Sequence, residues 1–166
     1  MGFSTLDGIP MGTRSGAVDP GVLLHLMRED GANLADIEDL LYNRSGLLGV
    51  SAISPDMRLL LQSDSPSASE AVAFFCYRIS RELGSLAAAL GGLDCLVFTG
   101  GIGENAAQVR ARVLHLSAWL GLEIDHQAND DGSACITSPG SGTSAWVVPT
   151  DEERVIAGHT RQILLA

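Results

Sequence analysis

Apolar residues recur with helical spacing in the first part of the chain. Asp19-Pro20 supplies an N-cap and a proline at the first helical position, and it predicts a helix that runs to about Glu29 and stops near Gly31. Asn33 begins a second predicted helix, which ends between residues 44 and 46. Its apolar residues lie on one face: Leu34, Ile37, Leu40 and Leu41.

A long segment with helical periodicity occupies the middle of the chain. The spacing Ser67-x-x-Glu70 fits a capping box, and it predicts a mostly buried helix from Ala71 to about Leu90 that ends at Gly91-Gly92. The preceding region, residues 49–61, alternates poorly and contains a proline, so we expect a loop there. This loop would carry Asp56-Met57-Arg58 into a short helix or turn.

The remaining segments alternate between strand and helix patterns. The apolar run Asp94–Phe98 fits a buried strand, and it precedes a glycine turn at Thr99–Asn105 and a helix from about Ala106 to Leu120. Further short strands are expected at residues 122–125, 134–137 and 145–148. Thr150-x-x-Glu153 then fits a capping box for a terminal helix. This order predicts an α/β domain.

Composition narrows the class of protein. The 166 residues are 46% hydrophobic, which favours one domain with one sizeable core. The formal net charge of −10 argues against binding to nucleic acid or to an anionic membrane surface. All the basic residues are arginines, so the lysine of a Walker-type phosphate loop is excluded. Without a leader-like start or an apolar stretch long enough for a membrane span, and with Cys76, Cys95 and Cys135 fitting reduced, buried thiols, we expect a cytoplasmic protein.

The glycine turn at Thr99–Asn105 is the most informative local feature. Glycines after a buried strand let backbone N–H groups approach a phosphate at a helix N-terminus, although a plain tight connection explains them equally well. Gly101-x-Gly103-x-x-Ala106 also fits the dinucleotide fingerprint, with Glu123 near the place of a ribose-binding acid. Against the dinucleotide interpretation, Glu104 puts a negative charge inside the pyrophosphate loop unless its side chain points away.

Several charged residues could contribute to a site. Arg14 lies in a flexible loop, where a guanidinium can grip phosphoryl oxygens, although a solvated surface arginine is the commoner case. Asp56 and Arg58 could contact a metal, a ribose or a phosphate, or form an ordinary surface ion pair. Glu152 and Glu153 suit the start of a helix, and one of them is free to approach a metal.

Four segments extend this picture over nearly the whole chain: Met11-Gly-Thr-Arg-Ser-Gly16 with Asp19-Pro-Gly21, Val50-Ser-x-Ile-Ser54 with Asp56-Met-Arg58, Phe98-Thr-Gly-Gly-Ile-Gly-Glu-Asn105, and Val148-Pro-Thr-x-Glu-Glu153. In this order and spacing they resemble the acetate kinase family, which outweighs the dinucleotide fingerprint. The resemblance implies an actin-like ATPase (ribonuclease H-like) fold, with a mixed sheet flanked by helices. Residues 1–166 would be the C-terminal nucleotide-binding domain, and the N-terminal catalytic domain would be absent.

The resemblance also implies an activity and a set of site residues. The complete enzyme would move the γ-phosphoryl group of ATP to acetate or a similar short carboxylate, reversibly and with Mg²⁺, and would form homodimers. Arg14 would stabilise the phosphoryl group in flight, and Glu152 would help to bind Mg²⁺. ATP or ADP would contact these residues: Asp56, Met57, Arg58, Gly101, Ile102, Gly103, Glu104 and Asn105. The chain alone is expected to be inactive.

Two departures from the family pattern bear on this site. Leu59 stands where the family usually has an acid, and Asp151 stands where it usually has asparagine. Two other classes of function stay open at this stage. A dinucleotide-binding oxidoreductase would prefer NAD to ADP and would depend on Glu123 rather than Arg58. A non-catalytic nucleotide-binding or assembly module would bind without transferring phosphate.

Overall fold

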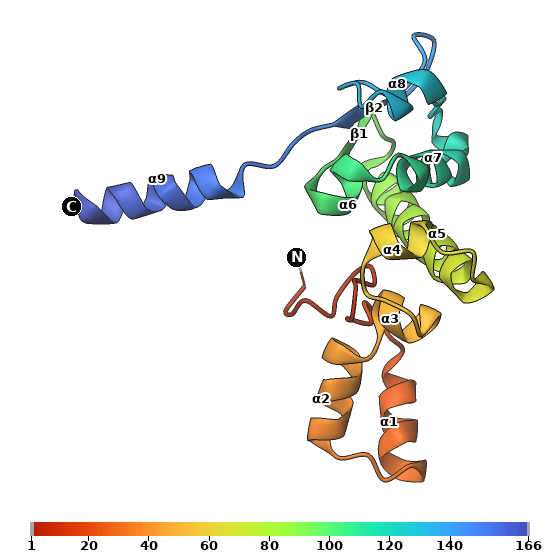
Figure 1. The fold of residues 1–166 in the computed structure, drawn as a ribbon, viewed down its shortest axis with the longest axis vertical. Coiled ribbons are helices and arrows are strands. Elements are labelled where there is room, and N and C mark those ends of the chain that lie inside the picture. Colours follow the sequence, from red (N-terminus) through yellow and green to blue (C-terminus); the bar gives the residue numbers. More distant parts are fainter. Residues whose placement is uncertain (1, 166) are drawn as a thin grey trace.

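Helices make up most of the structure, a computed structural model that describes residues 2–165 except for the side chain of Glu152 (Figure 1). The elements follow in this order: α1 (Pro20–Glu29), α2 (Leu34–Asn43), α3 (Gly46–Ser51), α4 (Met57–Leu61), α5 (Pro66–Leu90), β1 (Cys95–Phe98), α6 (Gly100–Asn105), α7 (Ala107–Leu116), the 3-10 helix η1 (Ala118–Leu120), α8 (His126–Asp130), β2 (Ser144–Val147) and α9 (Glu152–Leu164).

The first two helices form a hairpin at one end of the molecule (Figure 1). Both predicted starts are confirmed. The Asp19 side chain accepts a hydrogen bond from the Gly21 backbone N–H at 2.7 Å, and proline occupies the first turn of α1. In α2, Asn33 and Asp36 form a reciprocal capping box.

The central region differs from the prediction in two places. Residues 46–51 form the helix α3, so the loop predicted over residues 49–61 is wrong at its start. The backbone N–H groups of Gly49 and Ala52 donate to carbonyls one turn back. The helix α5 begins at Pro66, so Ser67 lies inside the first turn and the predicted capping box is wrong. The expected end at Gly91 is confirmed.

The sheet is small. Strands β1 and β2 pair in parallel, with Val97 opposite Trp146. The segments expected as strands at 122–125 and 134–137 make only isolated bridges, some of them antiparallel. The α/β class with a mixed arrangement is therefore correct, but β1 is not a buried strand, since Phe98 is its one buried residue. Cys95 on the same strand is exposed, contrary to the expectation of buried thiols.

The glycine segment after β1 is a helix rather than a turn followed by one long helix. Gly100 has a φ of +72°, which reverses the chain immediately after the strand. The six-residue helix α6 starts there, and Ala106, with φ −110° and ψ 80°, separates it from α7. The predicted helix from Ala106 to Leu120 is divided into two pieces, α7 and the 3-10 helix η1.

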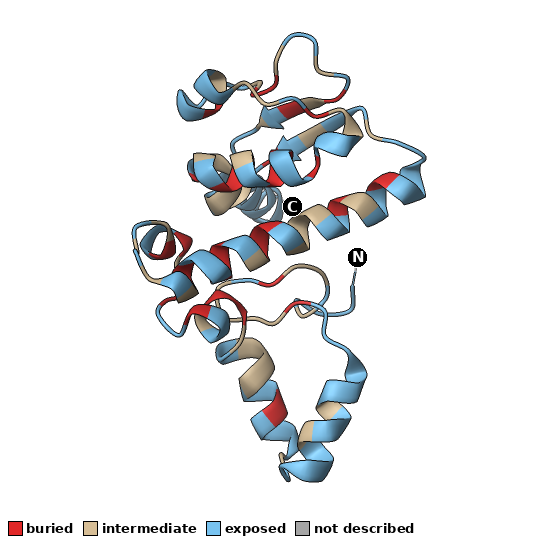
Figure 2. Cartoon of the chain, turned by 90° about the vertical axis from the view of Figure 1, so that its right-hand side faces the viewer, coloured by how far each residue is buried: buried red, intermediate tan, exposed pale blue. Residues whose placement is uncertain are grey.

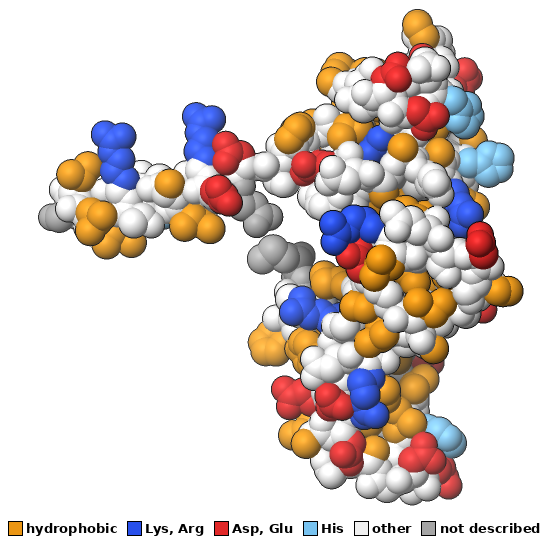
Figure 3. All heavy atoms as spheres, viewed as in Figure 1, with side chains coloured by type: hydrophobic (Ala, Val, Ile, Leu, Met, Phe, Trp, Pro, Cys, Tyr) orange, Lys and Arg blue, Asp and Glu red, His pale blue; other side chains and the backbone are white. Residues whose placement is uncertain are grey.

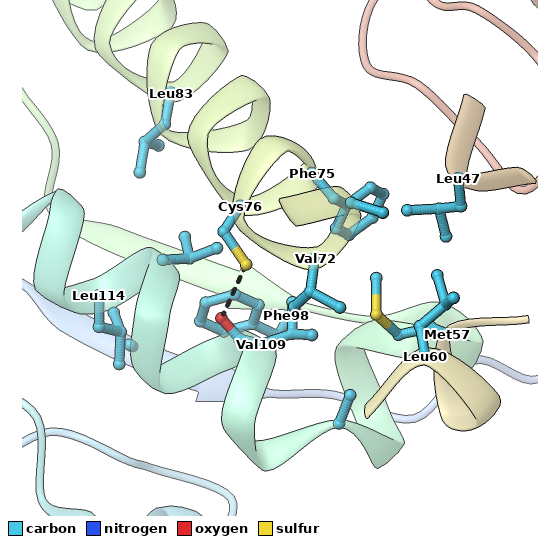
Figure 4. Close-up of a cluster of buried hydrophobic side chains, with 14 of the residues drawn as sticks. Leu47, Met57, Leu60, Val72, Phe75, Cys76, Leu83, Phe98, Val109 and Leu114 are labelled. Atoms are coloured by element: carbon cyan, nitrogen blue, oxygen red, sulfur yellow. Dashed lines mark hydrogen bonds between the residues drawn. The ribbon is translucent and has the colours of Figure 1, made fainter. Parts of the chain in front are cut away.

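One apolar core joins the central helices to the sheet. Val72 of α5 lies between Met57 and Leu60 of α4 on one side and Phe98 on the other, and Phe75 points toward Leu47 of α3 (Figure 4). Buried residues recur along α5, whereas α9 stands clear of the rest (Figures 1 and 2). Within the described part of the chain, no helix is long and apolar enough to cross a membrane.

Candidate functional site

The helices α4 and α6 line one pocket of about 610 Å³. Six of the residues expected to contact a nucleotide line it: Asp56, Met57, Arg58, Gly101, Ile102 and Asn105. These two groups lie more than forty residues apart in the chain. The core brings them together, because Met57 is buried in the same cluster as Phe98, the residue that leads into α6.

Asp56 and Arg58 form an exposed ion pair at the mouth of this pocket. The Asp56 carboxylate caps α4 by accepting from the Arg58 backbone N–H at 2.9 Å. The Arg58 guanidinium also donates to it at 2.6 Å and holds the pKa of the Asp56 carboxyl below its usual range. Because the Arg58 side chain is 83% exposed, the pair adds little stability, and the guanidinium is free to reach a ligand.

Within α6, the two glycines of the fingerprint have different surroundings. Gly101 lines the pocket. Gly103 faces the other way, where a Cβ atom would lie only 3.3 Å from the Phe98 carbonyl carbon, so it serves close packing of α6 on β1. The dinucleotide fingerprint needs its glycines in a turn before a helix, and here both lie inside one.

Glu104 does not line the pocket. Its Oε1 atom accepts hydrogen bonds from the Gly100 backbone N–H at 2.8 Å and from the backbone N–H and hydroxyl of Thr150, both at 2.9 Å. These donors, those of Thr150 above all, hold the pKa of the Glu104 carboxyl below its usual range. The carboxylate is therefore bound to Gly100 and Thr150 and does not project into the pocket between α4 and α6.

The end of β2 forms a second, open hollow beside the first. It is lined by Gly100, Gly101, Thr150, Asp151 and Glu153, so Gly101 borders both spaces. Asp151 is the N-cap of α9, and its side chain accepts from the Arg154 backbone N–H at 3.1 Å. The predicted cap at Thr150 is wrong, because that hydroxyl donates to Glu104 instead.

A buried arginine that was not predicted from the sequence holds the end of α6. Arg110 of α7 is 2% exposed, and its Nη1 donates to the carbonyls of Gly103 at 3.0 Å and Glu104 at 2.8 Å. Its Nε and Nη2 donate to the side chain and carbonyl of Asn129. The signal available in the sequence was an arginine among apolar helical positions, five residues after the glycine segment ends at Asn105.

Arg14 lies apart from the pocket. Its loop packs on the start of α3, where the Leu47 N–H donates to the Met11 carbonyl at 2.9 Å. The Arg14 guanidinium lies over the Tyr42 ring, 6.0 Å from its centroid. The Glu152 side chain lies outside the part that the structure describes, so its predicted contact with a metal stays a prediction. Among the residues that are described, no group of three or more His, Cys, Asp or Glu could hold a metal ion.

Comparison with known proteins decides the family. The sequence pattern of the acetokinase family matches residues 1–158. The chain belongs to this family. It is 59% identical over 161 residues to an acetate kinase of Rhodopseudomonas palustris (strain TIE-1), a match that covers 96% of this chain and 40% of that protein. An acetate kinase of Methylocella silvestris is 52% identical over 164 residues, which are 99% of this chain and 41% of the relative.

Solved structures of the family have the same fold. Porphyromonas gingivalis acetate kinase superposes with a TM-score of 0.89 at 41% identity, over 99% of this chain and 43% of that one. A propionate kinase from Francisella tularensis gives a TM-score of 0.89 at 39% identity, over 95% of this chain and 41% of that one. The actin-like α/β expectation is thus confirmed, and the dinucleotide-binding alternative is not favoured. The chain spans about 40% of the length of the curated relatives it matches.

Proposed function

We propose that this chain is the C-terminal, nucleotide-binding part of a kinase that transfers the γ-phosphoryl group of ATP to a short carboxylate such as acetate. The observation that carries the proposal is the pocket that α4 and α6 form together. It combines the exposed guanidinium of Arg58 with the glycine-rich surface of α6 at Gly101. Phosphoryl transfer relies on positioning and cationic stabilisation more than on covalent chemistry, and this pocket can supply both.

The residues of the pocket divide into those that would hold a nucleotide and those that would support them. Asp56, Met57, Arg58, Ile102 and Asn105 line it and would contact the nucleotide directly. We infer that Gly103 and Glu104, which the family resemblance adds to the nucleotide contacts, act instead by fixing the position of α6.

Mg²⁺ suits the hollow at the end of β2. Magnesium prefers oxygen ligands and is commonly held by one or two carboxylates together with substrate phosphates. The acids Asp151 and Glu153 border this hollow, and Glu152 starts the helix between them. The bound ion would neutralise charge on the transferring group. Asp151, in place of the family's usual asparagine, adds a negative charge there and would strengthen metal affinity.

Arg14 would act on the phosphoryl group only when the rest of the enzyme closes over the site, since it lies outside the pocket formed by this chain. We expect the carboxylate pocket and the catalytic acid of a full-length relative to come from the part that this chain does not match. The chain alone would then bind nucleotide without catalysis. Homodimer formation and a cytoplasmic location belong to the same proposal.

Titration calorimetry tests the proposal with Mg²⁺-ADP and with NAD. Arg58→Ala should weaken ADP binding by about tenfold to a hundredfold, as expected for a hydrogen bond to a charged group. Arg44→Ala is the matched control, because Arg44 also forms an exposed ion pair, with Asp39, and lies outside the pocket. Its ADP affinity should be unchanged.

The same titration is repeated with the unmatched part of a family member supplied in trans. Preferential binding of NAD would overturn the kinase proposal. So would the absence of ADP binding by a folded chain in both settings. Binding of ADP without any phosphotransfer in the reconstituted mixture would favour the non-catalytic module.

A further inference from the structure

Glu104 joins two segments that are 46 residues apart. One of its carboxylate oxygens, Oε1, accepts from Gly100 at the start of α6 and twice from Thr150 at the end of β2. The three donor–acceptor distances lie between 2.8 and 2.9 Å, the range of charge-assisted hydrogen bonds. The contact with Gly100 lies within α6 itself, whereas the two contacts with Thr150 reach a segment outside the helix.

The two segments are the two sides of the candidate site. Gly101 and Ile102, next to Gly100, line the pocket of the nucleotide. Asp151, next to Thr150, borders the hollow with the acids. The spacing between these two sides decides whether a phosphate can reach backbone N–H groups and a carboxylate-bound cation together.

We propose that Glu104 is a positioning residue that fastens α6 to the end of β2 and so sets the distance between the phosphate side and the metal side of the nucleotide site. The nucleotide part of this inference rests on the proposed function. Arg110 complements the fastening, because it holds the carbonyls at the other end of α6, those of Gly103 and Glu104. The short helix is then fixed at both ends, which keeps its N–H groups aimed before the ligand arrives.

The alternative role for this carboxylate is a direct contact with a nucleotide or its cation. The two roles differ in what the charge does. A ligand to a cation needs the negative charge, whereas a fastening needs an acceptor oxygen, which glutamine also has. Glu104→Gln should therefore keep most of the fastening, and Glu104→Ala should lose it.

Amide hydrogen exchange of the ligand-free 166-residue chain tests the fastening directly. In Glu104→Ala, the amides of Gly100 and Thr150 should exchange about tenfold faster, and Glu104→Gln should stay near the original protein. Thr150→Val removes the hydroxyl donor alone and should fall between them. The matched control is Glu123→Ala, which removes an exposed acid elsewhere. Unchanged exchange in Glu104→Ala, or equal effects of Gln and Ala, would overturn the fastening.

Ligand affinity tests the positioning role. Glu104→Ala should weaken Mg²⁺-ADP binding about tenfold while leaving adenosine, which has no phosphates, unaffected. A general loss of stability would weaken both ligands alike and would contradict the positioning role. An original chain that binds neither ligand, alone or with the unmatched part in trans, would overturn the proposed function and the positioning role together. The exchange result would still decide whether the fastening exists.

Discussion

The helices α5 and α9 are both long and amphipathic, yet they stand in opposite environments. The 25 residues of α5 include seven buried ones, and the helix packs against α3, α4 and α7. Every described side chain of the 13-residue α9 is exposed, including apolar ones such as Ile156 and Ile163. Figure 3 shows apolar side chains along one edge of α9 and basic ones along the other. An amphipathic pattern thus predicts a helix without predicting what it packs on.

The difference has an energetic consequence. Isolated helices shorter than about 12–15 residues are marginal in water, and most helices in proteins depend on packing of their apolar face. The core residues therefore stabilise α5, whereas nothing among the described residues does the same for α9. Substitutions in the core around α5 should therefore lower the free energy of unfolding, and substitutions in α9 should leave it unchanged.

The largest expected effect comes from the core. Leu114 of α7 is 1% exposed, and Leu114→Ala should lower the free energy of unfolding by about 2–5 kcal/mol, since it removes buried methyl groups and leaves a cavity. Leu116→Ala on the same helix is the matched control, because that side chain is 43% exposed. Urea denaturation measures both. Equal losses for the two variants would mean that α7 is not packed as described.

Arg110→Ala should lower the free energy of unfolding by about 2–4 kcal/mol. The substitution leaves the Gly103 and Glu104 carbonyls and the Asn129 side chain without their hydrogen-bond donor. Arg110→Lys should recover only part of this, since one ammonium group cannot replace a fork that reaches several acceptors. Arg112→Ala, at an exposed position on the same helix, is the control for urea denaturation. A fully stable Arg110→Ala protein would show that the buried hydrogen bonds contribute nothing.

These residues also show how far the sequence could be interpreted. Local signals such as Asn33 and Asp19 gave correct helix starts, because a cap acts through neighbours in the chain. The Thr150 cap was wrong, because its hydroxyl has a partner 46 residues away. Family resemblance named Glu104 as part of the site, but no local pattern could show which way its carboxylate points.

Removal of residues 155–166 tests the other side of the comparison. Urea denaturation can be followed by the fluorescence of Trp119 and Trp146. The free energy of unfolding obtained from its midpoint and slope should stay within about 0.5 kcal/mol of that of the full chain. The helical circular dichroism signal should fall only by the share of the removed residues. A large loss of stability would mean that α9 packs on the body in solution, and the contrast with α5 would then fail.

The smallest expected effect is a shift in the pKa of Glu104, whose carboxylate contacts Thr150 just before α9. The Thr150 and Gly100 donors lower the pKa of the Glu104 carboxyl. An acid whose folded pKa is depressed stabilises the folded state above its unfolded pKa, about 4.3 for glutamate, and this contribution disappears as the pH falls through the lower, folded pKa. A carboxyl carbon NMR titration should accordingly give a Glu104 pKa below that of glutamate in an unfolded chain. Thr150→Val should move it back upward, because the hydroxyl donor is lost. Glu104→Gln removes this carboxyl, so the resonance assigned to it should be missing from the spectrum of that variant. A Glu104 pKa that Thr150→Val leaves unchanged would contradict the hydroxyl contact between α6 and the segment that leads into α9.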